Sequence, residues 1–255
     1  MSPRRSEAVK IALELLVPVA LVAAWQLETM HVHSKKFSTP WSALVYFPHI
    51  AHDLTPTLVR LAEAFALGVV AGVAIGLPLG LSFWARHAAM PHVEFWRNMP
   101  PTAVLPVSIL LLHSIGDRQK VGFAFFFAAF PVLLNTIDAV RGIEPTMVDT
   151  ARSYGVPRRS RIARLVLPAA LPQIVAGMRN SLALSLILIL VAEYYSSTNG
   201  LGYVLLNSKN TFVYKPMWSA ILMIGLLGYA LNAVFLLFER RTLAWHRGWR
   251  AVTPQ

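Results

Sequence analysis

The sequence predicts an all-α protein that crosses a membrane about six times. Of its 255 residues, 56% are hydrophobic and only 14% are charged, and the mean hydropathy is +0.54. A soluble chain carries more charge on its surface, so this composition places the chain in a lipid bilayer. Proline interrupts several apolar runs, a pattern typical of transporter helices that line a cavity instead of facing lipid alone.

Charge and cysteine content exclude several other classes of protein. The net charge of +11 would suit nucleic-acid binding, but the lysines and arginines occur in short runs between apolar segments instead of along an aromatic-rich surface. They are therefore interpreted as topology signals. The chain has no cysteine, which excludes a disulfide framework, a thiolate metal site and a cysteine nucleophile.

The first apolar run extends from Ile11 to Leu27 and follows a start that carries three basic residues. This arrangement is similar to a secretory signal sequence, and "LVAA" at 21–24 leaves cleavage open. A run of about 17 residues also suits a short spanning anchor, so we expect the segment to be retained.

The polar stretch 28–56 follows, and a short interfacial helix is expected over Ser42–Asp53. Four histidines gather in this stretch and are His31, His33, His49 and His52. Imidazoles at such spacings could converge on a metal ion, but no carboxylate pattern completes a site. We therefore predict no metal site.

The second predicted span, Leu58–Trp84, carries a glycine at every fourth position, namely Gly68, Gly72, Gly76 and Gly80. Glycines at this spacing share one helix face and let another helix approach closely, so we expect them to serve helix packing. A groove that lines a substrate path is the alternative. A polar loop is expected at 85–99. The remaining predicted spans are the proline-broken Pro100–Gly116, then Val121–Val140, Ala169–Ala192 and Met217–Phe238.

Residues 144–168 form the longest polar interruption between apolar segments. Apolar residues at helical spacing predict one short helix that ends near Gly155, a C-cap residue type, and a second that begins at Pro157. The spacing of Asp149-Thr150-Ala151, Gly155, Leu165 and Leu167-Pro168 resembles the "EAA" loop of permease subunits of binding-protein-dependent ABC importers. Asp149, Thr150 and Leu165 depart from that pattern, where Glu, Ala and Ile are usual.

In that family the loop forms the cytoplasmic coupling helices that dock on an ATPase subunit. The resemblance implies coupling roles for Asp149, Thr150, Ala151, Tyr154, Gly155, Arg158, Leu165 and Pro168. The alternative is a basic amphipathic segment that lies on anionic lipid headgroups. That alternative explains the arginines but leaves the placement of Gly155 and Pro168 without a reason.

The resemblance covers roughly residues 40–245 and is closest to permeases of the sulfonate, taurine and nitrate type. Patches that carry it include "RNMPPTAVLP" at 97–106 and "VAEYYSSTNGLG" at 191–202. It implies a type I importer fold that works as a homodimer, with two cytoplasmic ATPase subunits and an external solute-binding protein. The implied division is an anchor and external loop at 1–56, a permease core at 57–240 and a cytoplasmic tail at 241–255.

Lysine and arginine are concentrated at the termini and in the loops on the same side of the predicted spans. By the positive-inside rule, both termini and the 144–168 loop are expected in the cytoplasm of a bacterium, with the spans in its inner membrane. No lysine follows a glycine, so the chain has no P-loop, and ATP and Mg²⁺ are expected on partner ATPase subunits. The chain itself is expected to hold no cofactor and to catalyse no reaction.

Polar residues inside the predicted spans are costly to insert and are therefore candidates for the substrate path. These candidates are Arg179, Asn180, Ser185, Glu193 and His113. For Arg179, the alternative is a structural arginine that pairs with Asp138 or reaches the membrane interface. At the level of function, the alternative is a secondary transporter or channel without an ATPase, which predicts inverted repeats or a ring of acidic groups. Neither feature is found in the sequence.

Overall fold

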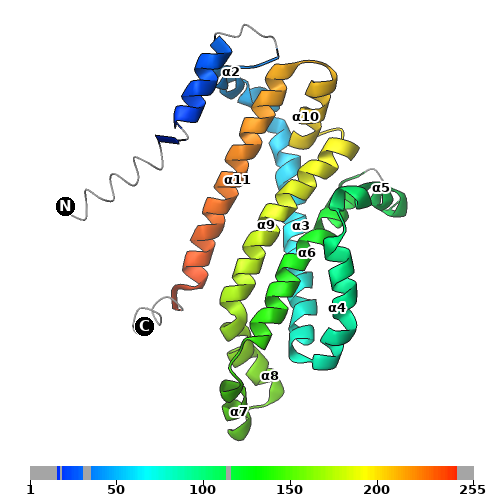
Figure 1. Cartoon of the computed structure of the whole chain (residues 1–255), viewed down its shortest axis with the longest axis vertical. Coiled ribbons are helices and arrows are strands. Elements are labelled where there is room, and N and C mark those ends of the chain that lie inside the picture. Colours follow the sequence, from blue (N-terminus) through cyan, green and yellow to red (C-terminus); the bar gives the residue numbers. More distant parts are fainter. Residues whose placement is uncertain (1–15, 18, 31–35, 113–115, 246–255) are drawn as a thin grey trace, which may run out of the picture.

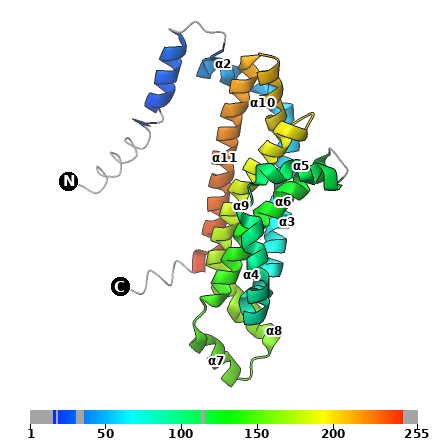
Figure 2. The same ribbon diagram turned by 45° about the vertical axis from the view of Figure 1, so that its right-hand side comes forward.

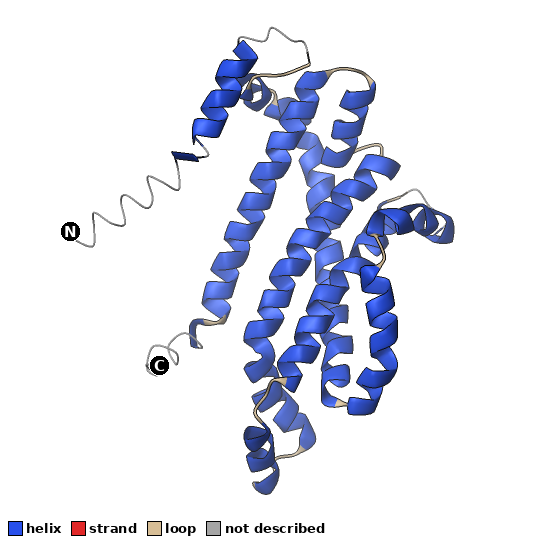
Figure 3. Ribbon diagram, in the orientation of Figure 1, coloured by secondary structure: helices blue, strands red, loops and turns tan. Residues whose placement is uncertain are grey.

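The computed structural model describes residues 16–17, 19–30, 36–112 and 116–245 (Figure 1). Every regular element in these ranges is helical, which confirms the all-α prediction (Figure 3). The labelled helices are α2 (Pro40–Val45), α3 (Phe47–Leu81), α4 (Phe83–Asn98), α5 (Pro101–Leu112), α6 (Asp117–Arg141), α7 (Pro145–Ser153), α8 (Arg158–Arg161), the π-helix η1 (Ile162–Val166), α9 (Leu167–Ser196), α10 (Leu201–Asn210) and α11 (Tyr214–Thr242).

Within the described residues, four helices are long and apolar enough to cross a membrane. They are α3, α6, α11 and the continuous helix Arg158–Ser196, which joins α8, η1 and α9. Val19–Met30 is a shorter apolar helix. Residues 11–15 and 18 of the predicted anchor Ile11–Leu27 lie outside the described residues, and whether the segment is retained stays a prediction.

The prediction of a polar loop at 85–99 is wrong. This stretch is helix α4, which returns from the end of α3 toward α5 and the start of α6 (Figures 1 and 2). The described part of the expected third span, 100–112, holds the 12-residue α5, about 18 Å long against a hydrocarbon core of about 30 Å. Sequence reasoning missed α4 because charged side chains interrupt its apolar residues.

The start of the second span also differs from the prediction. Helix α3 begins at Phe47, so the expected boundary at residue 56 falls inside it, and α2 and the first turns of α3 replace the interfacial helix. Pro56 lies within α3. Its missing N–H is tolerated near the end of a span, where water can reach the carbonyl that it leaves unbonded.

The four glycines of α3 lie against α6. A Cβ atom on Gly72 would lie 2.6 Å from the Cβ atom of Val132, and one on Gly76 would lie 2.7 Å from that of Thr136. Separations this short exclude any larger residue unless the helices move apart. On its other side α6 packs on α9, where the Ser181 hydroxyl donates to the Ala128 carbonyl at 2.7 Å. Helix α6 is therefore the centre of the bundle, between α3 and α9.

Candidate functional site

The turn between α7 and α8, residues 154–157, lies at the far end of the bundle (Figure 1). Gly155 has a φ of +70°, a conformation that glycine adopts at little cost, as its predicted place after a helix requires. The Val156 amide donates to the Ala151 carbonyl at 3.0 Å, and the Gly155 amide donates to that of Arg152 at 2.8 Å. These two bonds close α7, and the ring of Tyr154 stays 83% exposed beside them.

The second predicted short helix is not a separate element. Helix α8 continues through η1 into α9, so the turn is attached to a helix that crosses the membrane. Pro168 has no N–H to give the Arg164 carbonyl, which favours a local departure from α-helical bonding. At the end of η1 the Leu167 amide donates to the carbonyl of Ile162, five residues back, and not to that of Ala163, as it would in an α-helix.

The remaining residues of the coupling prediction lie on four elements, α7, α8, η1 and α9. Asp149 and Thr150 are exposed on α7, and the Asp149 carboxylate pairs with Arg152 at 3.1 Å. Arg158 is exposed on α8, whereas Leu165 and Pro168 are half-buried at the junction with α9. The exposed members therefore gather on the side of the turn that points away from the bundle core.

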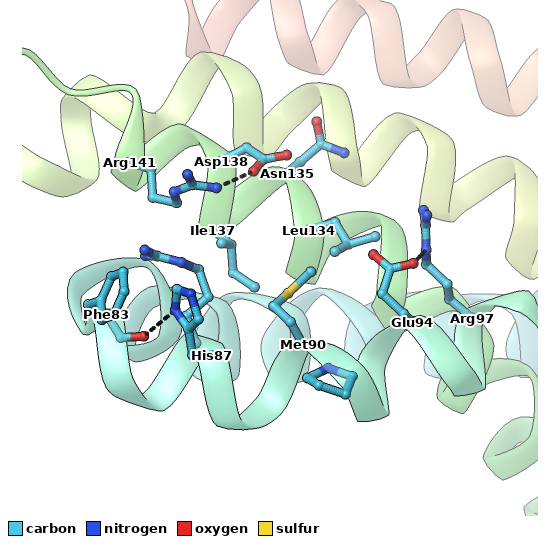
Figure 4. Close-up of a pocket in the computed structure, with 12 residues that line it drawn as sticks. Phe83, His87, Met90, Glu94, Arg97, Leu134, Asn135, Ile137, Asp138 and Arg141 are labelled. Atoms are coloured by element: carbon cyan, nitrogen blue, oxygen red, sulfur yellow. Dashed lines mark hydrogen bonds and ion pairs between the residues drawn. The ribbon is translucent and has the colours of Figure 1, made fainter.

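A cleft of about 960 Å³ separates α4 from α6 and is called here the α4–α6 cleft (Figure 4). Polar side chains from both helices line it: Arg86, His87, Glu94, Arg97, Asn135, Asp138 and Arg141. Glu94 pairs with Arg97 at 2.8 Å, and Asp138 pairs with Arg141 at 3.8 Å. No residue of α4 is buried.

Arg86 has no acidic partner in the described part of the chain. Its guanidinium lies 5.6 Å from the Phe83 ring and 3.5 Å from the Gly80 carbonyl oxygen. Charged side chains are costly to place against lipid, so the charged side of α4 requires water or protein beside it. The unbalanced Arg86 makes the α4–α6 cleft favourable for an anion.

Arg179 lies outside the α4–α6 cleft, in a pocket of about 220 Å³ between α9 and α11. Its Nε donates to Oδ1 of Asn232 at 3.2 Å. The expected alternative partner, Asp138, pairs with Arg141 instead, so that pairing is wrong. The reason is that Arg179 lies on the side of α9 turned toward α11, not toward α6.

The other candidates for the path are dispersed. Asn180 is exposed next to Arg179. Ser185 is fully buried, and its hydroxyl donates to the Ser181 carbonyl at 2.8 Å, so it serves the helix core instead of a cavity. The prediction for His113 lies outside the described residues.

Glu193 belongs to a partly buried ionic cluster at the opposite end of the bundle from α7. The Glu193 cluster comprises Thr57, Arg60, Asp117, Glu193 and Asn199. Glu193 is fully buried and accepts from Arg60 at 2.6 Å and from the Thr57 hydroxyl at 2.9 Å. Arg60 also bonds Asp117 at 2.7 Å and the Asn199 side chain.

The same groups hold the start of α10. The Gly200 amide donates to the Asp53 carboxylate at 2.8 Å, and the Leu201 amide donates to the Thr57 hydroxyl at 3.0 Å. The Gly202 amide donates to the Glu193 carboxylate at 3.1 Å. Carboxylates suit this position because the first amides of a helix have no partner within it. The cluster thus joins α3, α6, α9 and α10. Both carboxylate oxygens of Glu193 accept hydrogen bonds from other groups of the protein.

The candidates selected from the sequence did not include Arg60, although it bonds Glu193 in this cluster. A signal existed, because Arg60 falls inside a predicted span and carries the same insertion cost as Arg179. Among the described residues, no group of three His, Cys, Asp or Glu side chains could hold a metal ion. His31 and His33 lie outside these residues.

Several helices long and apolar enough to cross a membrane, a polar cleft and an exposed helical turn define the class of multi-pass membrane protein. Residues 66–244 match the family described as binding-protein-dependent transport system inner membrane component. The chain belongs to this family, which confirms the resemblance seen in the sequence.

Named relatives agree with this assignment. SsuC of Escherichia coli strain K12, whose name assigns it to aliphatic sulfonate transport, is 29% identical over 90% of this chain and 90% of its own length. TauC of the same strain, a taurine transport system permease protein, is 27% identical over 78% of this chain and 70% of its own. A chain of the inward-facing MetNI methionine ABC transporter has the same fold, with a TM-score of 0.62 and 18% identity over 76% of this chain and 95% of that one.

Proposed function

We propose that the chain is the membrane subunit of an ATP-driven importer in which two copies join two ATPase subunits and an external solute-binding protein. The observation that carries the proposal is the turn between α7 and α8. It presents an exposed Tyr154 and a glycine-dependent bend at the end of the 39-residue helix Arg158–Ser196. Movement of an ATPase subunit that contacts this turn would displace the whole helix Arg158–Ser196 across the membrane, as a rigid-body mechanism requires.

The second copy of the chain completes the path. Helix α4 leaves its polar side chains uncovered in one copy, and charged groups at membrane depth require a wall on the far side. Two α4–α6 clefts that face each other would enclose a water-filled route. We assign the termini and α7 to the cytoplasmic side of a bacterial inner membrane, because the last turn of α11 carries Arg240 and Arg241.

The solute is proposed to be a small organic anion, with aliphatic sulfonates and taurine as the first candidates. The names of the relatives support this class, and so does the unbalanced Arg86 in the α4–α6 cleft. ATP and Mg²⁺ would bind to the ATPase subunits, since this sequence has no P-loop.

Replacing Arg86 with glutamine is expected to lower sulfonate uptake about tenfold, the effect of roughly 1.4 kcal/mol on a rate. The change removes the unpaired positive charge of the cleft and leaves a shorter side chain that is polar and uncharged. Uptake of labelled taurine into vesicles that contain the whole complex measures the effect. Arg240→Gln, at the end of α11 and outside the cleft, is the matched control. Equal uptake by both variants would exclude the α4–α6 cleft as the anion path.

Isolation of the tagged chain from its native membrane tests the proposed function itself. An ABC ATPase should co-purify in a one-to-one ratio with the chain, in a particle that contains two copies of each. A chain that purifies alone from mild detergent, with full retention of its fold, would favour a transporter that works without an ATPase.

A further inference from the structure

A second cleft lies where the bundle meets α7 and α8. It has a volume of about 320 Å³ and is called here the basic cleft. Its walls combine apolar side chains with three arginines, Arg152, Arg158 and Arg161. The apolar part includes Leu81 and Val140 at the ends of α3 and α6. The cleft is therefore distinct from the α4–α6 cleft in both position and lining.

The arginines of the basic cleft have more positive charge than the protein around them balances. Arg152 pairs with Asp149 at 3.1 Å. In the part of the chain that the structure describes, no acidic side chain pairs with Arg158 or Arg161. Arg161 is half-buried beside the apolar residues. A guanidinium with five donors in such a place favours a bound anion with several acceptor oxygens.

The position of the basic cleft indicates which anion this is. Leu81 and Val140 are among the last apolar residues of α3 and α6, and Val166 is among the first of the helix Arg158–Ser196. The cleft therefore lies at the depth where hydrocarbon gives way to headgroups. A phospholipid presents a phosphate at this depth and acyl chains just below it. Arginine binds phosphate oxygens in a bidentate manner, and the apolar wall suits the chains.

The partner ATPase is a weaker candidate for this place. Tyr154, the most exposed ring of the turn, does not line the basic cleft, and Met147 lies at a separate pocket between α6 and α9. Arg158 is the residue that the basic cleft shares with the coupling prediction, so docking on the tip of the turn leaves Arg152 and Arg161 to the cleft. Its arginines come from α7 and α8, whereas its apolar wall includes the ends of α3 and α6.

We propose that the basic cleft binds the headgroup phosphate of an anionic phospholipid from the adjacent leaflet. The bound lipid joins α8 to the ends of α3 and α6 and holds the turn at a fixed angle to the bundle. This inference goes beyond the proposed function, because lipid binding requires neither the ATPase nor the solute.

The test uses the absence of cysteine in the chain. Ser153→Cys places a single thiol on the exposed side of α7, near the basic cleft but outside its lining, where a fluorophore can be attached without filling the cleft. The labelled chain is reconstituted in phosphatidylcholine vesicles that contain a small share of nitroxide-labelled phosphatidylglycerol or nitroxide-labelled phosphatidylcholine. We expect labelled phosphatidylglycerol to quench the fluorophore at about tenfold lower lipid fraction than labelled phosphatidylcholine.

Arg161→Gln should remove this preference, and Arg159→Gln should keep it. Arg159 lies on the same helix, carries the same charge and does not line the cleft. Equal quenching by the two lipids in the parent chain would overturn the proposal. Displacement of the labelled lipid by glycerol phosphate or inorganic phosphate would show a site for free phosphate and would overturn it as well. The readout is independent of transport, so it stands whether or not the importer function holds.

Discussion

Replacement of Glu193 by alanine is expected to destabilise the folded chain by about 3–5 kcal/mol, the effect of breaking a buried ion pair. The change leaves the guanidinium of Arg60, which is 2% exposed, without its buried carboxylate partner. It also removes acceptors from the Thr57 hydroxyl and from the Gly202 amide at the start of α10. Thermal unfolding of the purified chain in detergent measures the loss.

Two further variants serve as controls for the stability loss of Glu193→Ala. Glu94→Ala breaks the exposed pair with Arg97, whose side chains are 42% and 44% exposed, and should cost only about 0–1 kcal/mol. The double change Arg60→Met with Glu193→Met removes both charges and should recover much of the stability, because no charge is left buried alone. If Glu193→Ala unfolds at the same temperature as Glu94→Ala, the Glu193 cluster does not hold the bundle together.

Replacing Gly155 with valine is expected to abolish ATPase binding and uptake while the chain still inserts and forms dimers. The φ of +70° disfavours any residue with a Cβ atom by roughly 1–2 kcal/mol, and a β-branched residue by more. No atom lies within 4 Å of the position that the Cβ would occupy, so the effect comes from the backbone alone. Co-purification of the ATPase with the variant is the measurement.

Gly225→Val is the matched control. Gly225 also has open space around its Cβ position, but it lies inside α11 with ordinary helical geometry. Gly155→Asn should retain more function than Gly155→Val, because asparagine tolerates the left-handed region. Asp149→Lys should act more mildly than Gly155→Val, since it reverses a charge on α7 without forcing the backbone. Normal ATPase binding by Gly155→Val would exclude the turn as a coupling element.

The features that could be predicted from the sequence are those that depend on residues close together in the chain. Gly155 follows an apolar helical repeat and lies two residues before Pro157, so the turn at this place was predicted correctly. The long apolar runs likewise correspond to α3, α6, α9 and α11. In each case a continuous stretch of chain contains the whole signal.

The features that could not be predicted depend on contacts between distant segments. Arg60 and Glu193 are 133 residues apart, and neither carries a local sign of the other. Helix α4 appeared to be a loop because its polar residues face the α4–α6 cleft, and only the folded structure shows that a cleft exists. The η1 segment was missed because a π-turn leaves the apolar pattern almost unchanged.

Uptake driven by ATP is the most direct test of the central claim, that this chain couples an ATPase to the movement of a solute. The purified chain is reconstituted with its ATPase subunits and its external binding protein in vesicles, and accumulation of labelled taurine and ethanesulfonate is followed. We expect at least one of the two solutes to accumulate. Accumulation should require ATP on the side of α7 and should stop when the ATPase subunit is omitted. Accumulation that continues without ATP, or that never depends on the ATPase, would contradict it.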